Sequence, residues 1–329
     1  MKKLISLILV LAIICIYSMN YLEDVEYFIK QIKQEYLESN IDTKENNAEN
    51  KIENFKDIKI GDSKISVIKK LNKPDRIDKS EYNFLWYVYN SYEENFIMVG
   101  IKNNQVVALF TNNINSNESE KIYIDKDINY IRNNYETLKY KEKNNVRYEI
   151  SSENEYDVIY INHKYITVFY DKFNSNKIWA YEIIEKYSEE ETSDIYPVEG
   201  KDIEKSYMYE VVDLINSTRY KNYIKPLKIS EKATLSAKKH SLDMAKNNFF
   251  AHENLKKQTP FDRMKNEDIN YSTAGENIAA GQTNAIFEHN ALMNSYGHRK
   301  NILGNYKYIG VGVVFGGQYR TYYTEDFFG

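Results

Sequence analysis

A chain of 329 residues is long enough for two or three domains, because typical domains span about 100 to 150 residues. Hydrophobic residues make up 42% and aromatic residues 14%, which supports packed cores and excludes a wholly disordered chain. The net charge is −4 and the basic residues are spread along the chain. We therefore expect no nucleic-acid partner.

The N-terminus carries an export signal. Lys2 and Lys3 precede a run from 4 to 17 that is apolar except for Ser6, which is typical of a secretory signal. No A-x-A cleavage site follows, and 4–22 approaches the about 20 residues that span a bilayer, so 1–22 is a signal peptide or, preferably, an uncleaved signal anchor. We expect residues 4–22 to bind the cytoplasmic membrane and the rest to lie outside the cytoplasm, membrane-anchored or secreted.

The cysteine content limits the chemistry of the exported part. Cys15 is the only cysteine, and it lies within the apolar N-terminal run. The domains after it therefore contain no intramolecular disulfide, no cysteine zinc ligand and no cysteine nucleophile.

Two polar segments divide the remaining chain. Residues 23–54 are charged and Asn-rich and predict a stalk or linker, and residues 188–204 predict a second linker with an acidic run at 189–191. The domain between them, 55–187, shows a degenerate repeat of about 60 residues. Each unit has one amphipathic helical segment followed by three β-branched and aromatic runs. The predicted strands are 84–89, 96–101, 106–110, 156–161, 165–170 and 178–183.

The C-terminal region, 205–329, holds most of the groups capable of chemistry. Four of the five histidines fall in its last 90 residues: His240, His252, His289 and His298. The fifth, His163, has no second histidine or cysteine near it, so we expect an exposed turn residue. Apolar spacing predicts helices over 207–220 and 231–246, with Ser230 as the N-cap of the second and His252 in the loop beyond it.

Six blocks in this region resemble those of bacterial CAP domains, the superfamily of cysteine-rich secretory, antigen 5 and pathogenesis-related proteins, also called SCP-like. They are H-S-L-D-M at 240–244, N-F-F-A-H at 248–252, T-P-F-D-R at 259–263, A-G-E-N-I-A at 274–279, M-N-S-Y-G-H-R-K-N-I-L at 293–303 and I-G-V-G-V at 309–313. Asn216 and Arg219 match the N-x-x-R start of such domains. The I-x-I-G-x-S string at 58–63 and the K-P break at 73–74 similarly resemble the domain found N-terminal to CAP domains in some Gram-positive bacterial proteins.

The predicted fold class is therefore α+β. The resemblance implies a C-terminal α-β-α sandwich, the CAP fold, at 205–329. A duplicated α-β-β-β domain and an N-terminal apolar anchor helix precede it. The resemblance and the export signal together imply a Gram-positive-type cell surface.

The resemblance also implies a shallow cleft lined by two histidines and two glutamates that can hold a divalent metal. By motif, His252, Glu276 and His298 occupy three of these positions, and Ser295 stands where the second glutamate is expected. Two imidazoles and one carboxylate suit Zn²⁺. Glu288, seven residues before Ser295, is not assigned to this role, and His240 is interpreted as a packed helix residue near the cleft, bonded to a neighbouring loop.

Alternatives remain open for several residues. Glu276 could instead accept backbone N–H bonds in a structural turn. His289 is expected to be solvated, and Arg299 and Asn301 are expected to tie the loop after their helix to the sheet.

The favoured function is a cell-surface binding or scaffold module whose His/Glu cleft holds a divalent metal or a small ligand, with a wall component among the candidate partners. The alternative is a metal-assisted hydrolase of peptide or cell-wall material with Glu276 or a metal-bound water as base, although no H-E-x-x-H or G-x-S-x-G motif is present. A second alternative is lipid or sterol binding, as in some relatives of this superfamily.

Overall fold

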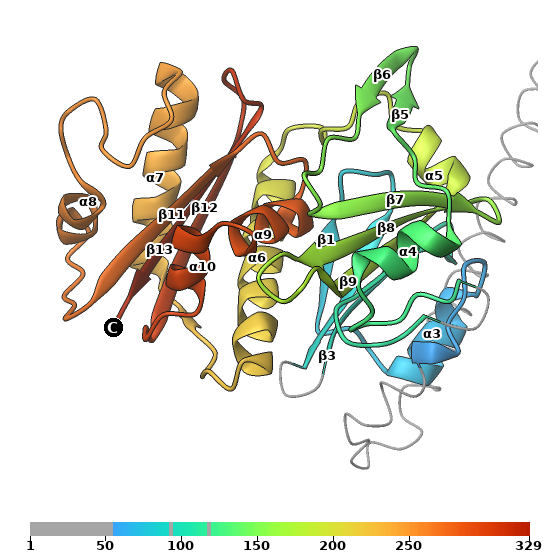
Figure 1. Ribbon diagram of the computed structural model, residues 1–329. Coiled ribbons are helices and arrows are strands. Elements are labelled where there is room, and N and C mark those ends of the chain that lie inside the picture. The colour runs from blue at the N-terminus through green and yellow to red at the C-terminus, as the bar shows by residue number, and fades with distance from the viewer. Residues whose placement is uncertain (1–54, 92–94, 117–119) are drawn as a thin grey trace, which may run out of the picture.

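The computed structural model describes residues 55–91, 95–116 and 120–329, so the predicted anchor and most of the predicted stalk lie outside the described residues. Within those ranges, none of the helices combines the length and the apolar character needed to cross a membrane. Figure 1 shows two sheets with helices between them and on both outer sides.

The N-terminal half is built on a seven-stranded antiparallel sheet with the strand order β1-β2-β3-β4-β9-β8-β7. Its strands are β1 (Arg76–Lys79), β2 (Leu85–Ser91), β3 (Asn95–Lys102), β4 (Gln105–Thr111), β7 (Tyr156–Ile161), β8 (Lys164–Asp171) and β9 (Lys177–Glu185). A separate hairpin pairs β5 (Tyr140–Lys143) with β6 (Val146–Glu149). The helices of this half are α3 (Lys64–Leu71), α4 (Ile128–Asn134) and α5 (Lys186–Glu190).

The order of one helix and then three main strands occurs twice in this half, and the two sets of strands meet where β4 pairs with β9. Asn103 and Asn104 form the β3–β4 turn, and Asn162 and His163 form the β7–β8 turn, all with positive φ. Positive φ at both central residues matches the right-handed twist of hairpin strands. His163 is exposed in its turn, as expected.

Both faces of the seven-stranded sheet are buried. Alternation along β2 places Trp86 and Val88 in one apolar cluster and Tyr87 and Tyr89 in another. The second cluster is covered by α3 and α4, which contribute Val67, Leu71, Ile128 and Ile131. The first cluster continues into the C-terminal half.

The C-terminal half has a four-stranded sheet in the order β10-β12-β13-β11, antiparallel except for the parallel pair β10–β12. Its strands are β10 (Lys228–Ile229), β11 (Ala274–Ala280), β12 (Tyr308–Phe315) and β13 (Thr321–Phe328). Its helices are α6 (Lys201–Lys221), α7 (Glu231–Asn247), α8 (Pro260–Asn266), α9 (Ala285–Met293) and α10 (Tyr296–Ile302).

Helix α7 packs closely on the outer face of this sheet. Ser230 caps it by accepting a 3.3 Å hydrogen bond from the Ala233 backbone N–H, as predicted. A Cβ at Gly310 would lie 2.0 Å from the backbone carbon of Ala233, and one at Gly312 would lie 2.2 Å from the backbone nitrogen of Lys238. The small side chains of α7 and these two glycines therefore let helix and strand approach to backbone contact.

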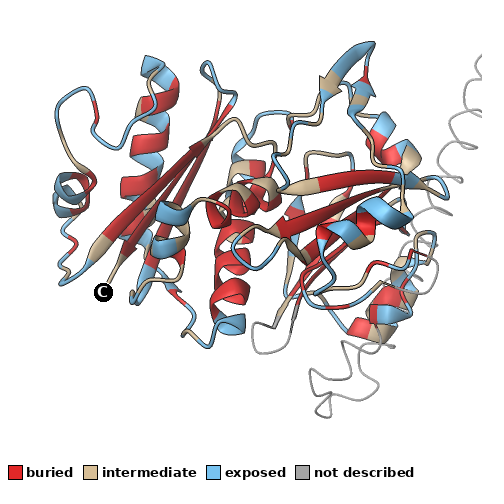
Figure 2. Ribbon diagram, viewed as in Figure 1, coloured by how far each residue is buried: buried red, intermediate tan, exposed pale blue. Residues whose placement is uncertain are grey.

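Helices α6 and α9 lie between the two sheets. One continuous apolar cluster joins Phe84 and Trp86 of the N-terminal sheet, Tyr207 and Leu214 of α6, and Val311 of the C-terminal sheet. Figure 2 shows α6 buried along most of its length. The C-terminal part is thus an α-β-α sandwich whose inner helix layer is shared with the N-terminal sheet.

Polar contacts also join the N-terminal half to α6 of the C-terminal half. Arg76 bridges Asp78 of its own strand and Asp213 of α6, with 2.7 Å between nitrogen and oxygen in both pairs. The amide of Asn112 donates to the Ser217 hydroxyl at 2.7 Å. The two halves therefore share both an apolar core and charged contacts.

Candidate functional site

Glu276, on β11, is the centre of the candidate site. Its side chain is only 1% exposed, and both of its oxygens are engaged. Oε1 accepts from Nδ1 of His252 at 2.8 Å, and Oε2 accepts from Nη2 of Arg263. A buried carboxylate needs such charged or hydrogen-bonded partners to remain ionised.

Arg263 also holds the loop that carries His252. The capping box of Thr259 and Asp262 begins α8, and Arg263 is the fourth residue of that helix. From there Nη1 donates to the backbone carbonyls of His252 at 2.7 Å and Gln258 at 3.1 Å. Arg263 therefore links the loop, α8 and β11.

His252 lies in the loop after α7, as predicted, with its side chain 52% exposed. Because a carboxylate only accepts, the bond to Glu276 places a proton on Nδ1 and, in the neutral ring, leaves the lone pair on Nε2. The exposed edge of the ring is thus a donor atom for a ligand or a metal ion.

His240 supports the same loop from α7. It is 1% exposed, and its Nε2 lies 3.0 Å from the backbone carbonyl of Ala251, to which it donates. Burial lowers the pKa of His240 to about 4 although Glu276 nearby favours the charged form. His240 is therefore neutral at neutral pH and positions the loop.

His298 enters the site from α10. Its Nδ1 lies 2.8 Å from the hydroxyl of Ser295, which stands at the N-cap position of that helix. Burial lowers the pKa of His298, and electrostatic repulsion between the His298 and His252 rings lowers it further. The two imidazoles are thus close enough to interact electrostatically.

The loop and helix around His298 are tied to β11 by amides. Asn301 donates to the backbone carbonyl of Glu276 at 3.1 Å and to the side chain of Asn277 at 2.9 Å. Asn277 donates to the backbone carbonyl of His298 at 3.2 Å. Asn301 therefore ties α10 to the sheet, as expected.

The prediction that Arg299 ties the same loop to the sheet of the C-terminal half was wrong. Arg299 forms two 2.9 Å hydrogen bonds to the carboxylate of Asp171, which ends β8 in the N-terminal half. The N-terminal half therefore contacts the segment that carries His298. A sequence pattern cannot reveal a partner 128 residues away.

The prediction that His289 is solvated is also wrong. Its side chain is fully buried, its Nε2 lies 2.8 Å from the Thr218 hydroxyl, and its ring meets Trp179 edge-on. Burial and the positive charge of Arg299 lower the pKa of His289 to about 3. The face of α9 that an isolated CAP domain would expose is covered here by the N-terminal sheet.

Glu288, also on α9, is buried beside Glu325 rather than in the cleft. Burial raises the pKa of Glu288, and the neighbouring Glu325 raises it further. Burial also raises the pKa of Glu325, to about 7, although a 2.8 Å hydrogen bond from the Asn277 amide opposes that shift. Glu288 therefore does not supply the fourth position at His298, where Ser295 stands.

A surface hollow of about 420 Å³ lies over this site. Its lining includes His252, Glu276, Thr259 and Asn301, but His298 is not among the lining residues. Among the described residues, no group of three or more His, Cys, Asp or Glu side chains is arranged to hold a metal ion. The arrangement offers two imidazoles, with Glu276 and Ser295 on their inner nitrogens.

Other motif residues are structural. Arg219 is 1% exposed and donates to the carbonyls of Lys225, Ile302 and Gly304 at 2.8 to 2.9 Å. Asn216 bonds both backbone groups of Leu227. The N-x-x-R pair thus ties α6 to the loops before β10 and β12.

Comparison with known proteins agrees with this architecture. Residues 212–327 match the cysteine-rich secretory protein family, CAP, and residues 60–194 match the CAP-associated N-terminal domain. The membrane protein YlbC of Bacillus subtilis is 30% identical over 285 residues, which cover 79% of this chain and 80% of YlbC. The chain belongs to the CAP proteins that carry a CAP-associated N-terminal domain.

Other similar proteins match one or both halves of the chain. Bacillus subtilis YkwD is 46% identical over 125 residues, which are 38% of this chain and 48% of YkwD. An extracellular SCP-domain protein of Bacillus anthracis has the same fold over 82% of this chain and 93% of its own, with a TM-score of 0.70 and 23% identity. A cysteine-rich secretory protein of Staphylococcus aureus has a TM-score of 0.64 and 19% identity over the same shares.

Proposed function

We propose that this CAP protein is an extracytoplasmic binding module whose cleft holds a divalent cation, or a small ligand, on His252 and His298 without turnover. The single observation that carries this is the hydrogen bond from His252 Nδ1 to the Arg263-bound carboxylate of Glu276. Metal-binding histidines characteristically donate their other ring N–H to a carboxylate, which fixes the tautomer and the ring orientation.

The residues present fit a two-imidazole site better than the three-ligand set predicted from the motifs. His252 and His298 would hold the cation through Nε2, while Glu276 and Ser295 bond the opposite nitrogens. Direct ligation by Glu276 would require it to leave Arg263, whose positive charge also repels a cation. A bound cation would supply a Lewis acid that polarises an oxygen of the ligand.

The same contacts weigh against hydrolysis with Glu276 as general base. A base must lie within hydrogen-bond reach of the proton it takes, and both oxygens of Glu276 already have partners. Glu276 is therefore assigned a positioning role.

The extracytoplasmic location is supported by the charged and apolar N-terminal sequence and by the names of the relatives, a membrane protein and an extracellular SCP-domain protein. Protease treatment of intact cells that express the full chain tests it. We expect the CAP domain to be digested while a cytoplasmic marker survives; equal protection of both would contradict the location.

Titration calorimetry of the full chain with Zn²⁺ tests the cation site. We expect His252→Ala and His298→Ala each to weaken binding at least about tenfold, and His163→Ala, which alters an exposed turn, to leave it unchanged. Equal affinity in all four proteins would overturn the site. If the protein released fragments from peptidoglycan or casein, and a chelator blocked that release, the proposal that the site binds without catalysis would be wrong.

A further inference from the structure

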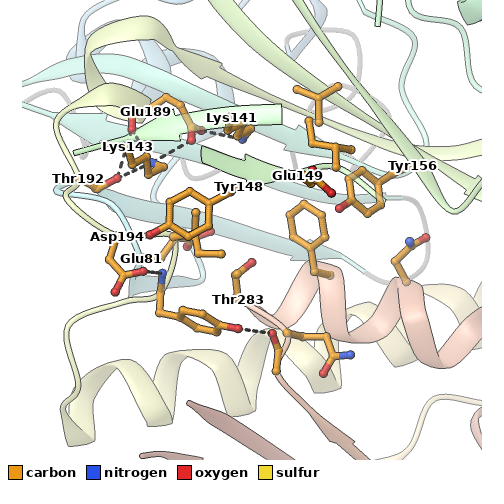
Figure 3. Close-up of a pocket in the computed structure, with 18 of the residues that line it drawn as sticks. Glu81, Lys141, Lys143, Tyr148, Glu149, Tyr156, Glu189, Thr192, Asp194 and Thr283 are labelled. Carbon is orange, nitrogen blue, oxygen red and sulfur yellow. Dashed lines mark hydrogen bonds and ion pairs between the residues drawn. The ribbon is translucent and has the colours of Figure 1, made fainter. Parts of the chain in front are cut away.

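A second cavity, of about 320 Å³, lies at the junction of the two halves (Figure 3). Its walls come from the β5–β6 hairpin, from the segment between α5 and α6, and from the loop between β11 and α9. None of its lining residues lines the hollow at Glu276. Ligand pockets typically measure about 300 to 1,000 Å³ and occur preferentially at domain interfaces.

Aromatic side chains form much of the wall: Tyr82, Tyr148, Tyr156, Tyr196 and Phe287. Two of them are held in place by neighbours. Tyr156 meets the ring of Phe287 edge-on at 5.0 Å, and the Tyr196 hydroxyl donates to the Gly281 carbonyl at 2.9 Å. The cavity therefore presents fixed ring surfaces to a ligand.

The charged groups of the wall are largely paired with each other or with neighbours outside it. Glu189 bonds Lys143 at 2.9 Å and Lys141 at 3.1 Å. Burial opposes the charge of Glu189, but these lysines outweigh it and lower the pKa of Glu189 to about 2. Glu189 and the two lysines therefore already have partners of opposite charge, and an ionic ligand would have to displace one of those partners.

Three more carboxylates of the wall are engaged in the same way, and the fourth, that of Glu149, is exposed. Glu155 pairs with Lys172 at 2.8 Å, and Asp194 pairs with Arg320 at 2.8 Å. Glu81 accepts from the Asn284 amide, and burial raises the pKa of Glu81. The interior consequently carries little uncompensated charge.

Several polar groups of the wall are still free to bond a ligand. Among the described residues, the side chains of Tyr148 and Glu149 form no hydrogen bond, and Oε1 of Gln282 is buried without a partner. Figure 3 shows Tyr148, Glu149 and Tyr156 on one side of the cavity and Thr283 across from them. A buried acceptor without a partner is costly, and a donor supplied by a ligand removes that cost.

We propose that this cavity binds a short, uncharged saccharide. A sugar ring offers an apolar C–H face to the tyrosine rings and a rim of hydroxyls that both donate and accept. Those hydroxyls match the Gln282 acceptor, the Glu149 carboxylate and the Tyr148 hydroxyl. The proposal concerns a site distinct from the His252 cleft and does not rest on the function proposed for it.

Calorimetry of the full chain with cellotriose, maltotriose and tri-N-acetylchitotriose tests this, with trilysine and triglutamate as charged probes. We expect at least one trisaccharide to bind, and Tyr148→Ala and Gln282→Ala each to weaken it about tenfold, the loss of roughly one aromatic or hydrogen-bonding contact. Tyr140→Ala is the matched control, because Tyr140 lies on the same hairpin, is 40% exposed and is outside the cavity wall. His252→Ala should also leave saccharide affinity unchanged.

Three results would overturn the proposal: binding of charged probes alone, no trisaccharide binding at millimolar concentration, or equal affinity in the wild type and both cavity variants. Amide chemical shifts of the wild-type protein provide a readout that no folding defect of a variant can disturb. The bound trisaccharide should shift residues 146–149 and 281–283, and shifts confined to other segments would equally overturn it.

Discussion

The guanidinium of Arg263 and the carboxylate of Glu276 form a buried ion pair, with the two side chains 8% and 1% exposed. Arg263 of α8 binds Glu276 of β11, and Glu276 in turn accepts a hydrogen bond from the imidazole of His252. This arrangement explains how a loop histidine, half exposed, is held in one orientation.

Removing Arg263 should therefore destabilise the protein strongly. Arg263→Ala leaves the Glu276 charge buried without its guanidinium partner, and breaking a buried pair in this way costs about 3 to 5 kcal/mol. Chemical denaturation measures the loss. Arg320→Ala, which breaks a pair 49% and 35% exposed, should cost less than about 1 kcal/mol, and equal losses in the two variants would contradict the account.

The contact between α7 and β12 gives a second prediction. Gly312→Ala places a methyl group 2.2 to 2.5 Å from the backbone of α7, which cannot move without shifting the helix, so we expect a loss of about 3 kcal/mol or more. Gly297→Ala, in α10, meets open space and should be neutral or slightly stabilising. Thermal melting of both variants compares them, and a stable Gly312→Ala protein would refute the close packing.

The sequence patterns predicted some helices and strands of the fold and missed others. Six of the seven strands of the N-terminal sheet were identifiable because both of their faces are apolar, and α7 because of its cap and its apolar spacing. Strand β1 was missed, because its sequence R-I-D-K is mostly polar. The β5–β6 hairpin was missed, because Lys141, Lys143 and Arg147 interrupt any apolar alternation. The role of Arg263 depends on α8 folding back onto β11, which no local pattern encodes.

The burial of His289 was likewise not visible in the sequence pattern, and it leads us to expect that the stability of the protein depends on pH. Its pKa falls from 6.5 to about 3 because it is buried and faces Arg299, so the folded state binds its proton less readily than the unfolded state. Stability should therefore fall as the pH drops below about 6.5, with a slope from this group approaching about 1.4 kcal/mol per pH unit until about pH 3.

Replacing the ring isolates that contribution. His289→Gln retains a partner for Thr218 but cannot titrate, so its unfolding free energy should fall less between pH 6 and pH 4 than that of the wild type. Urea denaturation at each pH measures the difference. The exposed His163→Gln should keep the wild-type slope, and identical slopes in all three proteins would contradict the assignment.

The pair formed by Arg299 and Asp171 should couple the two halves energetically. Both side chains are less than one-fifth exposed and the contact is bidentate, so a double-mutant cycle with Arg299→Ala and Asp171→Ala should give about 1 kcal/mol of coupling. The same cycle on Arg320 and Asp194 should give less, because that pair is more exposed. Independent, additive effects at Arg299 and Asp171 would show that the contact does not join the halves.

The central claim is that Glu276 orients His252 so that its outer nitrogen binds a ligand. Long-range nitrogen–proton NMR of the histidine rings in the wild-type protein tests this most directly. The account predicts that the neutral ring of His252 carries its proton on Nδ1, and that Zn²⁺ shifts Nε2 of His252 and His298. A proton on Nε2 of neutral His252, or Zn²⁺ shifts at neither ring, would contradict it.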